Sequence, residues 1–164
     1  MKRKTTQQLR RRQRQIKGRL RRAPRADRGP VLGAGKATYE LGERVRAIGH
    51  GGIGAAHNVV SRLGLAAEID ETVRLLKVHR PYHESDHVLN IAYNILCGGR
   101  TLDDIERLRM DEVHLDALGV EALPDPTTAG DFCRRFSETD VEALQDAVNQ
   151  VRLRAWAQQG SSLT

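Results

Sequence analysis

The chain has 164 residues, of which 39% are hydrophobic and 4% aromatic, and its formal net charge is +6 at pH 7. This length suits one domain with an appended segment, and no apolar run approaches the roughly 18 residues that a membrane-spanning helix requires. The first residues, MKRKTTQQLRRR, are charged without a following apolar stretch, which is not the pattern of a secretory signal. Cys97 and Cys133 lack metal-site spacing and indicate small buried residues of a reduced, cytoplasmic protein.

The positive charge is concentrated in an N-terminal arm. Residues 1–28 hold 13 Lys/Arg and one acid, Asp27, so the rest of the chain is acidic, with a net charge of −6. Repulsion is expected to keep this arm unfolded until a polyanion binds it, although a solvated tail or a membrane-surface helix is also conceivable. Because aromatic side chains are scarce, we predict contacts to DNA phosphates with little sequence specificity. The arm residues expected to make them are Arg10, Arg11, Arg12, Arg14, Lys17, Arg19, Arg21 and Arg22.

A Pro/Gly-rich linker is predicted over residues 23–38, so that residues 1–38 form a disordered arm and linker and residues 39–164 the folded domain. Residues 39–48 allow a short strand. GHGGIG at 49–54 then matches the dinucleotide-binding pattern G-x-G-x-x-G, which requires a buried strand before it and a parallel strand after it. The preceding ELGERVRAI is charged and the following segment has a helical period. We therefore interpret the glycines as a flexible lead into a helix.

From Gly52 onward the hydrophobic spacing predicts an all-α domain, a compact set of helices. The first helix is expected to end at Gly64, the third to run from Glu84 to Cys97, and a fifth to cover Glu112–Leu118 before Gly119. The apolar residues expected on the buried faces of the first three helices are Ile53, Ala56, Val60 and Leu63; Ile69, Val73 and Leu76; and Val88, Leu89, Ala92, Ile95 and Leu96.

Two helix starts carry capping patterns, Thr101 with Asp104 and Ser137 with Asp140. The first opens a helix that buries Leu102, Ile105 and Leu108. The second opens the longest helix, whose expected buried residues are Val141, Leu144, Val148, Val151 and Ala155.

Histidines and acids suggest metal sites, but helix capping explains them better. Pro81 breaks the helical register of the four-residue spacing of His79, His83 and His87, so His79 cannot share a helix face with the other two, for which polar capping of the following helix is favoured over a metal site. A two-metal carboxylate site is the alternative for five acids that we interpret as helix caps and first-turn acids: Asp103, Asp104, Asp111, Asp125 and Asp131.

The stretch PDPTTAGDFCRRF predicts a helix that starts at Pro126 or at the two threonines after it. Its first turn offers hydroxyls and N–H groups, and two arginines follow, which is typical of phosphate contacts in DNA-binding helices. The predicted contacts are Thr127, Thr128, Arg134 and Arg135. An ordinary core helix anchored by Phe132 and Phe136 is an equal alternative.

Four stretches together carry a resemblance to a known family: ERVRAIGHGGIGAAHNVVSRLGL, LLKVHRPYHESDHVLNIAYNILCGG, TLDDIERLRMDEVHLDALG and LPDPTTAGDFCRRF. Residues from about 44 to 156 resemble the N-terminal part of DDE-type bacterial insertion-sequence transposases. The resemblance implies a helical region that helps to recognise the ends of the element and to assemble the paired-end complex. In the family an RNase H-like domain with an Asp, Asp, Glu metal site follows.

No residue of this chain matches that triad, and the basic arm lies outside the resemblance. We therefore expect a truncated transposase that is inactive alone, with no cofactor in this chain and Mg²⁺ only in the missing catalytic domain. Its expected partners are the DNA of the element's ends and either itself or full-length transposase, at the nucleoid in the bacterial cytoplasm. The alternatives are a stand-alone DNA-binding regulator, and a non-functional remnant or helical interaction module.

Overall fold

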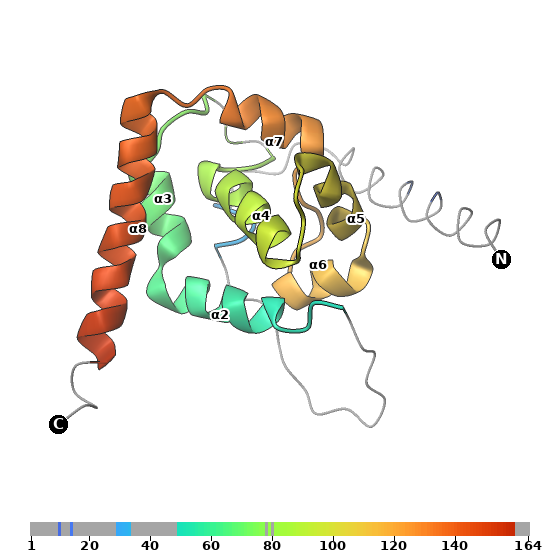
Figure 1. The fold of residues 1–164 in the computed structure, drawn as a ribbon, viewed down its shortest axis with the longest axis horizontal. Coiled ribbons are helices and arrows are strands. Elements are labelled where there is room, and N and C mark those ends of the chain that lie inside the picture. The colour runs from blue at the N-terminus through green and yellow to red at the C-terminus, as the bar shows by residue number, and fades with distance from the viewer. Residues whose placement is uncertain are drawn as a thin grey trace.

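The computed structural model describes residues 10, 14, 29–33, 49–77, 79 and 81–159. Within these residues all regular secondary structure is helical, which confirms the all-α prediction (Figure 1). They are α2 (Ile53–Leu63), α3 (Leu65–Thr72), α4 (Glu84–Leu96), the 3-10 helix η1 (Leu102–Asp104), α5 (Ile105–Arg109), α6 (Glu112–Leu118), α7 (Pro126–Cys133) and α8 (Glu138–Gln159). No helix in the described part combines the length and apolar character needed to cross a membrane. The possible strand over residues 39–48 and most of the predicted disordered arm lie outside the described residues.

Local signals set most helix ends. Gly64 ends α2 and Gly119 ends α6, each with a φ near +70° that a residue with a Cβ rarely adopts. At the start of η1 the Thr101 hydroxyl and the Asp104 carboxylate form the predicted capping box. These ends were predictable because each depends on residues within one helical turn.

Helix α4 lies at the centre of the fold, with α2, α3, α5, α6 and α7 around it (Figure 1). Leu89 and Tyr93 of α4 belong to the main core, together with residues of α2, α3, α5 and α6. Its other buried members are Leu32, Ile53, Ala66, Cys97, Leu108, Met110, Leu115, Leu118, Val120 and Leu123. A smaller core joins α3 to α8 through Ile69, Val73 and Ala147.

The predicted buried face of α4 is partly wrong. Leu89 is buried, but Ile95 and Leu96 are 64% and 66% exposed, whereas Asn90 and Asn94 are buried. The amide of Asn90 donates to the carbonyl of Pro124 at 3.1 Å, and that of Asn94 donates to the carbonyl of Thr101 at 2.9 Å. Because these bonds give each buried amide nitrogen an acceptor, the central helix turns a partly polar face toward its neighbours.

The helix that contains Ile69 is shorter than its hydrophobic period predicts. α3 ends at Thr72, and Val73 is already extended. Leu76, the expected third position of the stripe, lies beyond the helix, where its N–H binds the carboxylate of Glu84. The chain after Thr72 is thus extended and is held by Glu84, so the hydrophobic period overestimates the length of α3.

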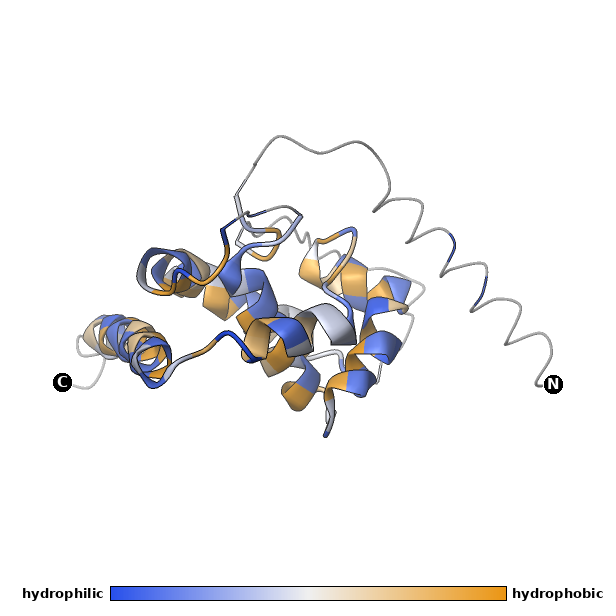
Figure 2. Cartoon of the chain, turned by 90° about the horizontal axis from the view of Figure 1, so that it is seen from above, coloured by the Kyte–Doolittle hydropathy of each residue, from blue (hydrophilic) through white to orange (hydrophobic). Residues whose placement is uncertain are grey.

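α8 lies at one side of the molecule, packed mainly on α3, and Figure 2 shows apolar and polar residues mixed along it. Ala147 is 1% exposed, whereas Val148, a predicted core residue, is 38% exposed. Val141 is exposed too, and of the predicted stripe Val151 alone is fully buried. The contact face is thus rotated from the predicted one, and an ion pair from Arg154 to Glu68 of α3 supports it.

Candidate functional site

The first turn of α4 is both polar and buried. Glu84, Ser85, Asp86 and His87 are each exposed by 3% or less. Burying a polar group costs free energy unless it forms a hydrogen bond. The hydrogen-bond partners of these side chains therefore identify the segments that this turn connects. They come from three separate segments of the chain.

Glu84 holds the segment between α3 and α4. Its Oε1 accepts hydrogen bonds from the backbone N–H groups of Leu75 and Leu76, at 3.0 and 2.8 Å. Its Oε2 lies 3.1 Å from Nε2 of His79. One buried carboxylate thus binds two backbone groups and one imidazole from this segment.

Asp70, near the end of α3, is bound by the next residue of the turn. The backbone N–H and the hydroxyl of Ser85 both donate to its carboxylate, at 2.8 and 3.0 Å. Burial raises the pKa of Asp70 and the carboxylate of Glu84 adds to the rise, while the two bonds from Ser85 and the nearby His83 oppose it. Two acids therefore lie close together in a largely desolvated place.

Asp86 binds the N-terminal linker. Its carboxylate accepts from the N–H groups of Val31 at 3.2 Å and Leu32 at 2.8 Å, and from that of His83 at 2.9 Å. The side chain of Leu32 is fully buried in the main core. Sequence reasoning placed residues 31 and 32 in a disordered linker. In the structure they are part of the folded body, because a carboxylate 54 residues away satisfies their N–H groups.

The prediction that His79 shares no helix with the other two histidines is correct, because α3 ends at Thr72 and α4 begins at Glu84. The rings of His79 and His83 nevertheless stack, with centroids 4.8 Å apart. His87 instead stacks on Phe132 of α7, and burial lowers its pKa to about 4. The expected capping role is correct for His83, the N-cap of α4.

Of the predicted arm contacts, the structure describes Arg10 and Arg14, which are helical and exposed. The others lie outside the described residues: Arg11, Arg12, Lys17, Arg19, Arg21 and Arg22.

The predicted contacts near α7 are all described. Thr127 and Thr128 lie in its first turn, where the carboxylate of Asp125 accepts from the N–H and the hydroxyl of Thr128 at 2.9 and 3.0 Å. Arg134 and Arg135 follow its end and are exposed, and Arg134 pairs with Asp131. The carboxylate of Asp125 thus occupies the start of α7, where a phosphate was expected to bind. Arg134 and Arg135 are the basic residues of this region.

Helix capping accounts for most of the acids that suggested a two-metal site. Asp104, Asp111 and Asp125 each accept a backbone N–H at a helix start. Hydrogen bonds lower the pKa of Asp104. Asp131 is the exception to our prediction, because it lies in the second turn of α7 and pairs with Arg134 there.

The residues of the glycine-rich stretch form the lead into α2, as predicted. Gly49 to Gly52 lie in turns and Gly54 is buried inside the helix. No strand is present among the described residues to complete a dinucleotide-binding unit. Comparison with protein families, curated proteins and solved structures finds no match to this chain.

Sequence reasoning missed the acids that organise the fold, Asp70, Glu84 and Asp86. The signal available was HESDH at residues 83–87, five consecutive polar residues at the start of a helix that is otherwise rich in apolar ones. Such a run in a central helix indicates polar contacts to distant segments.

Proposed function

We propose that this chain is the DNA-binding and assembly portion of a DDE-type insertion-sequence transposase, and that its arm binds phosphates at the ends of the element. The observation that carries the proposal is the separation of charge. Thirteen basic residues and one acid occupy residues 1–28, and the remaining chain is net negative. Four ordered stretches that resemble these transposases support the assignment to this class of DNA-binding protein.

The charge separation defines how such a protein meets a duplex. DNA carries one negative charge per ~1.7 Å of its axis, so an acidic body is repelled while a basic arm is attracted. Arg10 and Arg14 are helical, exposed and four residues apart, which puts them on one face of a helix. The thirteen cations of residues 1–28 are enough for six to ten phosphate contacts.

The contacts of Asp86 anchor the chain to the body just after the arm. The linker is fixed at Val31 and Leu32, a few residues after the last cation of the arm. Since little free chain separates arm and anchor, DNA bound by the arm stays near the helical body. Arg134 and Arg135 at the end of α7 are the body residues proposed to add phosphate contacts, and Thr127 and Thr128 are weaker candidates because Asp125 lies beside them.

In this proposal DNA binding requires no cofactor. Mg²⁺ belongs to the catalytic domain that the resemblance implies, and a second copy or a full-length transposase is the protein partner. The proposed place of action is the bacterial nucleoid.

Fluorescence anisotropy with a labelled duplex tests the proposal. We expect the full chain to bind duplex DNA near physiological salt with a Kd of about 10⁻⁶–10⁻⁴ M, the range of charge-driven binding. A full-length variant with Gln at positions 10, 11, 12 and 14 should bind at least about 10-fold more weakly. The matched control replaces two exposed arginines of the body, Arg107 and Arg152, and should bind as the parent does.

Equal affinity of the arm variant and the parent would refute the role of the arm. Footprinting then tests the transposase assignment itself. Protection confined to the ends of an insertion element supports it, whereas a single protected site elsewhere indicates a stand-alone regulator.

A further inference from the structure

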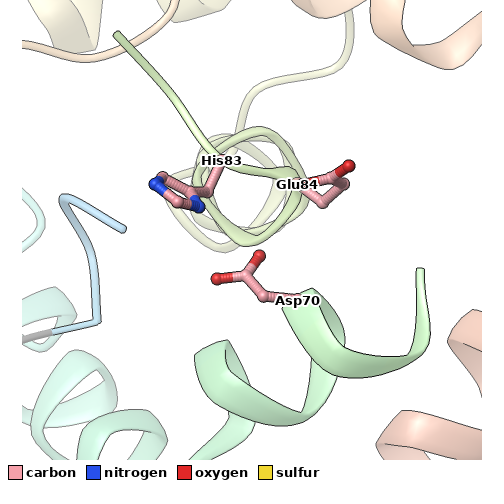
Figure 3. A group of neighbouring side chains, drawn as sticks. All are labelled: Asp70, His83 and Glu84. Atoms are coloured by element: carbon pink, nitrogen blue, oxygen red, sulfur yellow. The ribbon is translucent and has the colours of Figure 1, made fainter. Parts of the chain in front are cut away.

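Three side chains with metal-binding groups lie close together where α3 meets α4. Asp70, His83 and Glu84 each offer one ligand atom, and these atoms all lie within 4.8 Å of one another (Figure 3). Among the described residues, these three are the group of His, Cys, Asp or Glu side chains whose ligand atoms lie this close to one another. His79 adjoins it, because its Nε2 lies 3.1 Å from Oε2 of Glu84.

We propose that Asp70, His83 and Glu84, with His79 as fourth ligand, bind one Zn²⁺-class ion. A mixed set of imidazole nitrogens and carboxylate oxygens suits zinc and its transition-metal neighbours, whereas Mg²⁺ and Ca²⁺ prefer oxygen ligands in greater number. Zinc bound tetrahedrally at about 2.0–2.2 Å holds its ligand atoms roughly 3.3 Å apart. The present spacing of up to 4.8 Å is therefore about 1.5 Å too long, and the ligand atoms would have to draw together as the ion binds.

The carboxylates are already oriented for such a role. Ser85 donates two hydrogen bonds to Asp70, and two backbone N–H groups hold Oε1 of Glu84. In metal sites, outer hydrogen bonds of this kind fix the direction of the ligands and strengthen binding. The second oxygen of Glu84 faces His79, so it is the atom placed to bind an ion between the acids and the imidazoles.

The electrostatics favour a cation in the same place. Glu84 is 1% exposed and Asp70 is half-buried, so two carboxylates share a space from which most water is excluded. Burial raises the pKa of Asp70, and repulsion from the charge of Glu84 adds a smaller part to the rise. A divalent ion between them would offset this repulsion and the cost of burial.

The ion would have a structural role. It would join the end of α3 through Asp70, the segment before α4 through His79, and the first turn of α4 through His83 and Glu84. Asp86 of that same turn binds the linker, so the metal would also support the anchor of the arm.

Metal titration of the full-length protein, first stripped with chelator, tests the proposal. We expect Zn²⁺ to bind with one-to-one stoichiometry in calorimetry and to raise the melting temperature. Co²⁺ should give the visible absorption of a tetrahedral site with nitrogen and oxygen ligands. Mg²⁺ and Ca²⁺ at the same concentrations should have neither effect.

Variants assign the ligands. Asp70→Asn and His79→Ala should each weaken Zn²⁺ binding at least about 10-fold. His50→Ala, which removes a histidine outside the cluster, should leave the affinity unchanged. Circular dichroism at low temperature establishes that each variant is folded before it is titrated.

Three results would overturn the inference. One is a wild-type protein that shows no Zn²⁺ binding and no metal-dependent rise in melting temperature. The second is binding that survives both Asp70→Asn and His79→Ala, and the third is Co²⁺ spectra that show thiolate ligands. The wild-type measurements decide the matter even if a variant fails to fold.

Discussion

Leu32→Ala tests whether the linker belongs to the folded body. The side chain of Leu32 is 0% exposed and contributes to the core that contains Ile53 and Leu89. Replacing a buried leucine with alanine costs about 2–5 kcal/mol, depending on how far the site can collapse around the cavity. We expect a loss in the lower part of this range, about 2–3 kcal/mol. If Leu32 lay in a disordered linker, the substitution would leave the free energy of unfolding unchanged.

Urea unfolding followed by far-ultraviolet circular dichroism is the suitable assay. The single tryptophan, Trp156, is 59% exposed, and its fluorescence would report poorly on the core. With a slope of about 2 kcal/mol/M, the expected loss lowers the urea midpoint by roughly 1–1.5 M. Leu153→Ala is the matched control, because Leu153 is 55% exposed and its removal should change stability by less than about 0.5 kcal/mol. Equal midpoints for the two variants would refute the burial of Leu32.

Three further predictions concern the helical body. Gly99→Ala should destabilise it by about 1–3 kcal/mol in thermal melts, because the new Cβ would lie 2.2 Å from Oδ1 of buried Asn94. Ala147→Asp should lower the melting temperature far more than Val148→Asp, since an unpaired buried charge costs several kcal/mol; the reverse order would show that α8 packs through the face predicted from sequence. The pKa of His87 is lowered from 6.5 to about 4, so the unfolded chain binds its proton first as the pH falls below 6.5. In the presence of chelator, the contribution of His87 to stability should then fall by about 2 kcal/mol between pH 7.5 and pH 5, and His87→Gln should remove that part of the pH profile; an unchanged profile would contradict a neutral, buried imidazole.

The sequence predicted the parts of the fold that depend on neighbouring residues. The ends of α2 and α6 follow from Gly64 and Gly119, and the start of η1 follows from Thr101 and Asp104. In each case the residues that satisfy the backbone lie within one helical turn of the end. A local pattern is then sufficient to place it.

The polar cluster could not be predicted in this way. Asp86 finds the N–H groups of Val31 and Leu32 more than 50 residues away, and no local pattern encodes such a pairing. Asn90 and Asn94 are buried although they are polar, so a pattern of apolar residues could not identify the buried face of α4. Hydrophobic periodicity assumes that buried faces are apolar, and the central helix departs from that assumption because its neighbours offer carbonyl partners.

The histidines show a related limit. Pro81 correctly predicts that His79 lies outside α4, but breaking a helix does not separate two side chains in space. The chain before α4 is held against Glu84, and this contact returns His79 to His83. The proximity of His79 to the cluster of Asp70, His83 and Glu84 therefore depends on tertiary contacts that a local sequence pattern does not encode.

The salt dependence of DNA binding tests the central claim most directly. If six to ten cations of the arm meet phosphates, log K for a duplex should fall against log salt with a slope of roughly −5 to −9. Deleting residues 2–28 should remove most of that slope and most of the affinity, while circular dichroism shows that the body keeps its helices. A deletion variant that binds duplex DNA with unchanged affinity and slope would contradict the account.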